Sequence, residues 1–416
     1  MTSSISPLLE PRQERLLLFT LAAINFTHIV DFMVMMPLGP QFIEIFQITD
    51  AQFGFLVSSY TLAAGFSGLL ATSYIDRFER KGLLLRLYAA FALSTLACGL
   101  APNHTFLLIA RIASGLFGGV LSAMAQTMVG DAIPFERRGR AMSIVMGSFS
   151  LATVAGVPLS LWLASITHWH GPFIAVALMS GVIWVLGYFT LPQMAQHVSL
   201  SSSTLTWQSA IAPLRSILVV PNHLNALIFS AFVMSASFVV IPYITIFATA
   251  NLHLTNEQLP LIYLFGGLAT LFTIRIWGVL TDKWGKVRTF RLIALLSMAP
   301  LLILTHLKAV GLWELISVTT LFFIFVSGRM VPSMAILTST VDPRLRGTFM
   351  SLNSATQSCA MGLASFVGGL LIHRDAQGQL MGYTSAGWLA TALTLLAVFW
   401  VGQLKMLDSP DPEPKK

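Results

Sequence analysis

Long apolar stretches separated by short polar clusters make up most of the 416-residue chain. A helix that crosses a bilayer needs about 20 predominantly apolar residues. Lipid offers no partner to an open backbone, so such segments must be helical. Twelve of them lie at approximately 16–38, 52–75, 83–101, 105–130, 141–165, 172–191, 224–249, 258–280, 289–307, 312–338, 348–372 and 383–404. The pattern predicts an all-α polytopic membrane protein with twelve transmembrane helices.

The composition strengthens this interpretation. Hydrophobic residues make up 55% of the chain and charged residues only 10%, whereas soluble domains carry about 25% charged residues. A soluble enzyme and a disordered chain are therefore excluded. The formal net charge of +7 is spread thinly along apolar sequence, so we expect no nucleic-acid partner and expect the lipid bilayer as the surroundings.

The basic residues predict the orientation, because cytoplasmic loops of membrane proteins are enriched in Lys and Arg. With the N-terminus in the cytoplasm, nineteen of the 24 basic residues fall in cytoplasmic segments. Only Lys308 and Arg374 fall in outer loops, and Arg111, Arg275 and Arg329 lie within predicted spans. This asymmetry predicts cytoplasmic N and C termini in a bacterial inner membrane.

Two similar halves are indicated by repeated loop sequences. Asp76 and Asp282 begin related basic loops 206 residues apart, and Arg138 and Arg346 begin related R-G segments 208 residues apart. We therefore expect a six-helix bundle at 1–191, a cytoplasmic linker at 192–223 with a weakly amphipathic segment at 207–218, and a second six-helix bundle with a short polar tail at 224–416. Such internal repeats are typical of secondary transporters, whose substrate site lies between the halves.

The loop motifs resemble those of the major facilitator superfamily, and the resemblance extends over essentially the whole chain. The superfamily pattern G-x-x-x-D-R/K-x-G-R/K is matched in the second half by Gly278, Asp282, Lys283, Gly285 and Lys286. In the first half Asp76, Arg77, Arg80 and Lys81 match it, whereas Thr72 and Glu79 replace its glycines. The resemblance implies the major facilitator fold and a conformational latch at these loops. The alternative is that the basic residues serve orientation alone.

Other segments resemble the twelve-helix drug:proton antiporter branch, in particular its arabinose-efflux-like group. Leu107, Arg111 and Gly115 fit the fourth-helix pattern, and residues 327–332 resemble the tenth helix of that group. Gly147, Gly156 and Pro158 look like the antiporter motif of helix five. Pro158 lacks a backbone donor and should bend this helix. The resemblance implies proton-coupled export of a small organic compound.

Asp31 is the one acidic residue, of seventeen, that we place at hydrocarbon depth. With a rise of 1.5 Å per residue, it lies roughly 22 Å from the cytoplasmic side. Arg111 lies roughly 9 Å from the outer side, so in a core about 30 Å thick the two are at a similar level and could form an ion pair. Intramembrane ionisable residues usually face a partner or a cavity.

We therefore expect Asp31 to bind the coupling proton, with Arg111 and His28 assisting. Burial favours the neutral form of a carboxyl group and a nearby cation favours the charged form, so a conformational change could shift this balance. The alternatives are a fixed structural Asp31–Arg111 pair and a direct contact of Asp31 with substrate. His28 could instead be a hydrogen-bonded helix histidine, and Arg329 could bind substrate, act in gating or cap polar groups of a neighbouring helix.

The cavity between the halves should be lined by a stripe on helix one and by polar residues of other spans. Asn25, His28 and Asp31 recur every three residues, and Phe32 and Met35 extend this stripe. The further candidates are Arg329, Gln126, Tyr243, Asn353, Gln357 and, more weakly, Tyr60.

Other chemistry finds little support in the sequence. The nine histidines are scattered without the spacing of metal ligands, and phosphate-binding and nucleophile-elbow motifs are missing. We therefore expect no metal, no cofactor and no enzymatic activity. Cys98 and Cys359 lie in apolar segments of opposite halves and are expected to be buried thiols rather than a disulfide.

The most economical interpretation is a monomeric, proton-coupled secondary transporter that moves a small molecule by rocking of 1–191 against 224–416. Export is favoured by the antiporter-like fifth helix. A proton-coupled metabolite importer is the first alternative. A non-transporting membrane receptor or scaffold on the same fold is the second, against which the intramembrane Asp31 argues.

Overall fold

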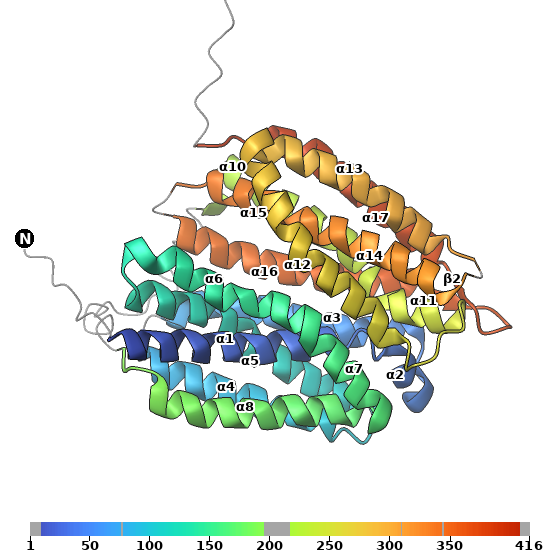
Figure 1. Cartoon of the computed structure of the whole chain (residues 1–416), viewed down its shortest axis with the longest axis horizontal. Helices are drawn as coiled ribbons and strands as arrows, with labels where there is room; N and C mark the ends of the chain where they lie inside the picture. The colour runs from blue at the N-terminus through green and yellow to red at the C-terminus, as the bar shows by residue number, and fades with distance from the viewer. Residues whose placement is uncertain (1–9, 76–77, 195–216, 309, 343–344, 408–416) are drawn as a thin grey trace, which may run out of the picture.

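The computed structural model describes residues 10–75, 78–194, 217–308, 310–342 and 345–407. Its helices run roughly along the long axis of the molecule, with the first half below and the second half above in Figure 1. The first half contains α1 (Pro11–Val34), α2 (Gly39–Phe46), α3 (Asp50–Tyr74), α4 (Arg80–Gly99), α5 (His104–Ala132), α6 (Phe135–Leu151), the π-helix η2 (Ala152–Gly156), α7 (Val157–Ile166) and α8 (His170–Thr190).

The second half repeats this helical organisation and adds a small hairpin. It contains α10 (Pro221–Phe238), the 3₁₀ turn η4 (Ile241–Tyr243), α11 (Ile244–Ala250), α12 (Leu259–Trp284), α13 (Lys286–Thr305), α14 (Leu312–Gly328), α15 (Met330–Ser339), α16 (Arg346–Leu371), β1 (His373–Arg374), β2 (Leu380–Met381), α17 (Tyr383–Trp400) and the 3₁₀ turn η5 (Val401–Gln403). The strands pair antiparallel, with His373 opposite Met381. The sequence pattern predicted neither this hairpin nor the short helix α2.

Eleven helical segments within the described residues are long and apolar enough to cross a membrane. They coincide with eleven of the twelve predicted spans, with ends that differ by a few residues. The remaining predicted span corresponds to α16, which has 26 residues but is interrupted by Ser, Thr, Asn and Gln side chains. Whether α16 is a twelfth span stays a prediction.

Three of the predicted spans are broken helices, and a proline accounts for each break. Proline has no backbone N–H, so the carbonyl four residues earlier loses its helical partner. Pro242 lies four residues after the end of α10 at Phe238, and Pro332 lies four residues after the end of α14 at Gly328. Pro158 lies two residues after the end of the π-helix η2. In η2 the chain adapts by a wider turn, in which the Val157 N–H donates to the Ala152 carbonyl.

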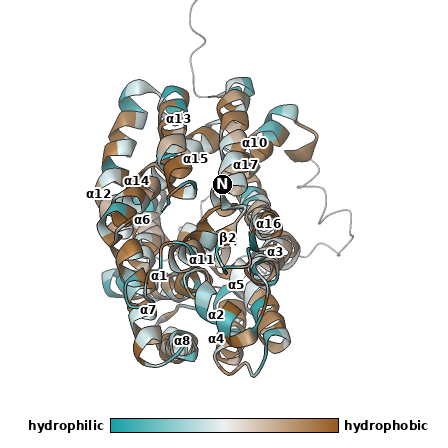
Figure 2. Cartoon of the chain, turned by 90° about the vertical axis from the view of Figure 1, so that its right-hand side faces the viewer, coloured by the Kyte–Doolittle hydropathy of each residue, from teal (hydrophilic) through white to brown (hydrophobic). Residues whose placement is uncertain are grey.

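Among the described residues, the buried apolar cluster that combines both halves lies at one end of the molecule. We call this the hairpin end, since it contains α2, α11 and the β1–β2 hairpin, at the right of Figure 1 and facing the viewer in Figure 2. One buried apolar cluster there combines Phe42 and Phe53 of the first half with Tyr243 and Phe247 of the second. The other large clusters each take their buried residues from a single half. They lie toward the opposite, terminal end, where α1 begins and η5 ends.

The longest contact between the halves is formed by α3 and α16, which lie side by side. Glycines permit this close approach: a Cβ at Gly65 would lie 2.7 Å from Cys359 Sγ, and a Cβ at Gly362 would lie 2.7 Å from the Thr61 hydroxyl. Apolar burial gives little driving force between helices in lipid, so such small-residue packing is the expected form of association.

Two expectations concern residues that are only partly described. Residues 195–216, which include most of the expected linker at 192–223, lie outside the described residues, as do Asp76 and Arg77. Cys98 and Cys359 are both free thiols in the structure, the first buried and the second partly exposed.

Candidate functional site

Asp31 and Arg111 form an ion pair inside the first half. Nη1 of Arg111 on α5 donates to Oδ2 of Asp31 on α1 at 3.0 Å and to the Asp31 backbone carbonyl at 3.2 Å. The Asp31 side chain is 0% exposed and the Arg111 side chain is 1% exposed. The Thr95 hydroxyl of α4 lies beside the Asp31 carboxyl group. Neither this hydroxyl nor Oδ1 of Asp31 has a hydrogen bond of standard geometry among the described residues. One carboxylate oxygen is therefore bonded to Arg111, whereas the other has only the Thr95 hydroxyl beside it among the described residues.

Tyr60 of α3 covers this pair. The Arg111 guanidinium lies 4.2 Å from the centre of the Tyr60 ring, well within cation–π range. The Tyr60 hydroxyl is 2.9 Å from Nδ1 of His28, which is partly exposed one turn before Asp31 on α1. The structure thus brings together all three of the predicted proton-coupling residues, with Tyr60 between them.

Arg329 is an equally buried arginine in the second half, but its partners are neutral. It is 1% exposed and lies where α14 ends and α15 begins. Its guanidinium donates to Ser237 Oγ at 2.6 Å, to the Val233 carbonyl at 3.3 Å and to Thr394 Oγ1 at 3.2 Å. These partners belong to α10 and α17, so in this structure Arg329 joins three helix segments within one half.

Several predicted cavity residues are buried inside a half or in the shared core. Asn25 hydrogen-bonds to Ser122 of α5 and to the Val145 carbonyl of α6. Asn25 and Asp31 are six positions apart and therefore differ by about 120° around the helix, which explains why Asn25 faces α5 and α6 instead of a cavity. Met35 is fully buried in the core at the hairpin end, and Tyr243 donates its hydroxyl to the Ser365 carbonyl at 2.5 Å. These three side chains therefore line no open space here.

The other predicted cavity residues differ in exposure. Asn353 is 1% exposed, and its Oδ1 lacks a partner among the described residues. Gln357 is partly exposed and donates to Ser230 Oγ at 3.0 Å, Gln126 is exposed on α5, and Phe32 is partly exposed. Of these candidates, Phe32, Gln126 and Gln357 are the ones whose side chains are not fully buried.

Comparison with known proteins identifies the family. The model of the Major Facilitator Superfamily matches residues 21–274 and 224–416, which together cover almost all of the chain. The chain belongs to the major facilitator superfamily. It is 24% identical over 358 residues to the uncharacterized transporter YceJ of this superfamily from Bacillus subtilis (strain 168), covering 85% of this chain and 89% of that one. The chain is accordingly a multi-pass membrane protein of a transporter family.

Solved structures share the fold. An inward-facing, unoccupied bacterial homolog of the human lysosomal transporter Spinster has a TM-score of 0.74 at 15% identity, covering 96% of this chain and all of that one. The D-xylose–proton symporter has a TM-score of 0.73 at 17% identity, covering 94% and 97%. At such identities the likeness concerns the fold alone.

In the first superfamily loop, Arg80 forms an ion pair and further hydrogen bonds. Arg80 donates from Nε to Asp131 of α5 at 3.1 Å and from Nη1 to the Ile75 carbonyl at 2.9 Å. Glu79, which replaces a motif glycine, caps α4 and also accepts the backbone N–H of Met194 at 3.1 Å. Lys81 lies 5.6 Å from the ring of Tyr188. This loop therefore holds together α3, α4, α5 and the segment after α8.

The second superfamily loop makes fewer contacts. Asp282, Lys283 and Gly285 are exposed, and Gly285 has a φ of +86° that favours glycine. Lys286 donates to the Ser339 hydroxyl at the end of α15. A Cβ at Gly278 would meet nothing within 4 Å, so the close approach expected from the motif is absent at this position. Among the described residues no ion pair involves Asp282.

The antiporter-like motif of helix five coincides with the π-helix η2. A Cβ at Gly156 would lie 2.4 Å from a methyl group of Val30 on α1, so glycine is required there. Gly267 of α12 approaches η2 from the second half, where a Cβ would lie 3.1 Å from the Thr153 carbonyl oxygen and from Val154. Gly147, in contrast, is exposed with no neighbour within 4 Å. Gly156 of the motif thus permits close packing of η2 against α1 within the first half, whereas the contact of η2 with the second half is made by Thr153 and Val154.

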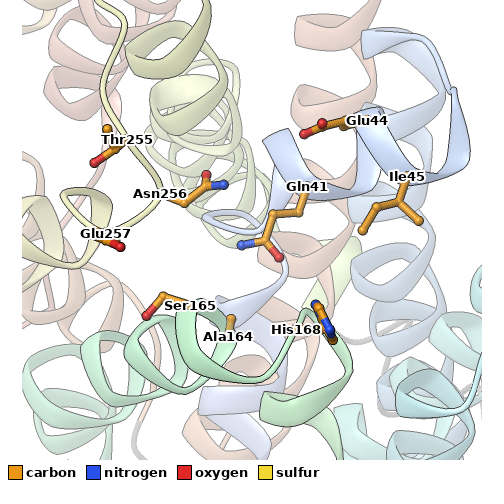
Figure 3. Close-up of a pocket in the computed structure, with 9 residues that line it drawn as sticks. All are labelled: Gln41, Glu44, Ile45, Ala164, Ser165, His168, Thr255, Asn256 and Glu257. Atoms are coloured by element: carbon orange, nitrogen blue, oxygen red, sulfur yellow. The ribbon is translucent and has the colours of Figure 1, made fainter.

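A pocket of about 520 Å³ at the hairpin end crosses the seam between the halves. Figure 3 shows Gln41 and Glu44 of α2 facing Asn256 and Glu257 of the second half across it, with Ser165 and His168 below. A second pocket beside it, of about 950 Å³, contains the ion pair between Asp50 and Arg374 in its wall. None of the predicted site residues lines either pocket.

Sequence reasoning missed Ser237, Phe238 and Asp131, and it named Tyr60 only as a weak candidate. A signal for Ser237 was present: it follows Asp31 by 206 residues, the same offset as between the two loop motifs. Phe238 had the same signal, since it follows Phe32 by 206 residues. Asp131 has no comparable signal, because a lone loop acid in a membrane protein is unremarkable without contacts.

Proposed function

We propose that this protein is a proton-coupled secondary transporter of the drug:proton antiporter branch that exports a small organic compound across the bacterial inner membrane. In this proposal α16 is the twelfth span, both termini are cytoplasmic, and the terminal end faces the cytoplasm. The two six-helix halves, residues 1–191 and 224–416, rock against each other around a central cavity, and the chain acts as a monomer.

The observation that supports this function most strongly is the buried Asp31–Arg111 pair. A carboxylate at full burial is expensive in a membrane unless it is paired or has a functional role. The pair commits one oxygen of Asp31 and leaves the other without a regular partner, so protonation can occur without a large rearrangement. Partly exposed His28, bonded to Tyr60 over the pair, lies where protons would arrive from the cavity.

The arrangement of the halves supports alternating access. Shared apolar packing closes the hairpin end, whereas the clusters toward the terminal end belong to separate halves. The α3–α16 contact and the contact between η2 and α12 would serve as the surfaces about which the halves rotate. The basic loops at the terminal end, including Arg80, Lys81, Asp282 and Lys286, would close in the opposite state and act as the latch.

The decisive test is Asp31→Asn in proteoliposomes with an imposed pH gradient. We expect gradient-driven transport to fall by at least 100-fold while the protein folds and still exchanges substrate without a gradient. Asp375→Asn is the matched control, since this acid lies in the hairpin turn and should transport normally. Wild-type pH-driven transport by Asp31→Asn would rule out the mechanism.

Direction and substrate need separate measurements. Substrate movement in the direction opposite to that of the protons would indicate antiport and export. Substrate movement in the same direction as the protons would indicate an importer. Absence of substrate-dependent proton movement across drugs, sugars and amino acids, with binding retained, would indicate a receptor or scaffold. The partly exposed Phe32 and Gln357 and the exposed Gln126 favour an apolar or uncharged compound. Arg329 would act in gating through the break between α14 and α15.

A further inference from the structure

A continuous series of aromatic rings runs from the Asp31–Arg111 pair to the second half. The Tyr60 ring, which covers the Arg111 guanidinium, stacks on Phe32 with centroids 5.5 Å apart and planes inclined by 23°. Phe32 in turn stacks on Phe238 of α10 at 6.1 Å and 24°. Each spacing lies in the range in which aromatic pairs attract each other. The ion pair is thus two ring contacts away from the seam.

Phe238 occupies a critical place in the second half. It is the last residue of α10, immediately before the break caused by Pro242, and it directly follows Ser237, which accepts a hydrogen bond from Arg329. The Phe32–Phe238 contact therefore joins α1 to the end of a helix segment that Arg329 holds in place. It is separate from the long α3–α16 contact.

Tyr60 is held so firmly that it must follow changes in its surroundings as a rigid unit. Its hydroxyl is bonded to His28, and α5 packs closely against it. A Cβ at Gly118 would lie 2.8 Å from both the Tyr60 hydroxyl and Nδ1 of His28, and a Cβ at Gly115 would lie 2.3 Å from the Tyr60 carbonyl. The ring has little freedom to absorb a movement of Arg111 by turning alone.

We propose that Tyr60 is a positioning residue that transmits the state of the Asp31–Arg111 pair, through Phe32 and Phe238, to the contact between the two halves. This inference rests on the proposed proton coupling. When Asp31 is neutral, the guanidinium loses its counter-ion and keeps two partners, the Asp31 backbone carbonyl and the face of the Tyr60 ring. The altered stack changes how well Phe32 fits Phe238, so the two protonation states favour different positions of the halves, as coupling requires.

The charged and titratable groups that surround Asp31 limit the possible alternatives. They are Arg111 on α5, Tyr60 on α3, Cys98 on α4 and His28 on α1 itself. Of these four groups, Arg111 alone is charged at every pH at which a carboxyl group titrates. Arg111 also contacts both Asp31 and an aromatic ring. The ring series is therefore a direct route from the proton site to the other half, beside the contact of α3 with α16.

The test measures two quantities on the full chain in nanodiscs. Spin labels on the two halves at the terminal end report their separation as a function of pH, and infrared difference spectra report protonation of Asp31 as a carboxyl band lost in Asp31→Asn. We expect Tyr60→Leu and Phe238→Leu to keep the Asp31 band but to reduce the pH-dependent change in separation at least fivefold. Tyr60→Phe keeps the ring and should retain most of the change.

The matched control is Phe229→Leu, because Phe229 pairs with Phe290 wholly within the second half. It should retain the full pH response. The double variant Tyr60→Leu/Phe238→Leu should lose no more than either single variant, since both interrupt one series. A wild-type response in Tyr60→Leu and Phe238→Leu, with Asp31→Asn unresponsive, would overturn this inference alone. A pH response that persists in Asp31→Asn would overturn the proposed function with it.

Discussion

Among the described residues each half has one arginine that is only 1% exposed, and the two halves treat its charge differently. Arg111 in the first half and Arg329 in the second are both 1% exposed, and each hydrogen-bonds to the first helix of its own half, α1 or α10. Arg111 meets the carboxylate of Asp31 there. Arg329 meets Ser237, which follows Asp31 by the 206-residue offset of the repeat.

This difference separates an arginine that is paired with a carboxyl group from one whose hydrogen-bond partners are all neutral. A buried ion pair is sensitive to the loss of either charge, because the remaining charge is uncompensated. Arg329 has no carboxylate partner among the described residues; neutral oxygens from α10 and α17 surround it instead. We infer that the first half contains the proton chemistry, whereas the second half uses its arginine to hold helices together across the α14–α15 break.

Removal of Arg111 should have the largest effect on stability. In Arg111→Met, Asp31 remains fully buried without its counter-ion, and we expect a loss of about 3–5 kcal/mol in the free energy of unfolding. Chemical unfolding in detergent micelles, followed by tryptophan fluorescence, measures this loss. The double variant Asp31→Asn/Arg111→Met removes both charges and should recover most of the stability. Equal losses in the single and double variants would show that the ion pair does not set the stability of the first half.

The sequence was sufficient to predict eleven of the long membrane-spanning helices and the common level of Asp31 and Arg111, because these depend on hydropathy and helix rise. It could not predict which way a side chain faces around a helix. Asn25 therefore turned out to hydrogen-bond within the first half, and Tyr243 to lie in the core at the hairpin end. The stacking of Phe32 on Phe238 joins residues 206 positions apart and depends on how the halves pack.

Sequence and structure also differ in the motifs that rely on glycine. Gly156 has the close neighbour that its motif implies, whereas Gly147 and Gly278 have open space around them. A motif records that a small residue is tolerated or required, but the distance to the neighbouring helix decides which. Glu79 shows the reverse case, since a departure from the pattern introduces a cap on α4 and a bond to Met194.

Introducing an acid into the second half tests whether Ser237 truly corresponds to Asp31. Ser237→Asp places a carboxylate beside Arg329, so its burial is compensated and the stability should change little. Ser230→Asp is the matched control on the same helix, where the buried serine faces Gln357 rather than Arg329. An unpaired acid there should cost about 3 kcal/mol. Similar losses in the two variants, measured by thermal unfolding, would contradict the correspondence.

Removal of Arg329 should cost less than removal of Arg111. In Arg329→Met, Ser237 and Thr394 retain hydroxyl bonds to carbonyls of their own helices, so little is left unsatisfied, and we expect a loss of about 1–2 kcal/mol. The pH dependence of transport should be unchanged while its maximal rate falls. A shift of the pH profile would assign Arg329 to the proton chemistry and would remove the functional difference between the halves.

A third arginine contact extends the comparison to a half-exposed site. Arg374 of the hairpin pairs with Asp50 of the first half at 3.3 Å, but its side chain is 37% exposed. Solvent screens such a pair, and Asp50 also lies in the first turn of α3, where the helix dipole stabilises a carboxylate without any cation. We therefore expect Arg374→Gln to change the unfolding free energy by about 0–1 kcal/mol. Because this pair joins the two halves, its loss should instead open the pocket beside it. In a Glu44→Cys background, Arg374→Gln should therefore raise the rate at which a thiol reagent labels the pocket wall. Added salt should produce the same increase when Arg374 is retained. A loss of stability as large as that of Arg111→Met would mean that position across the seam, rather than burial, determines what an arginine contributes to this fold.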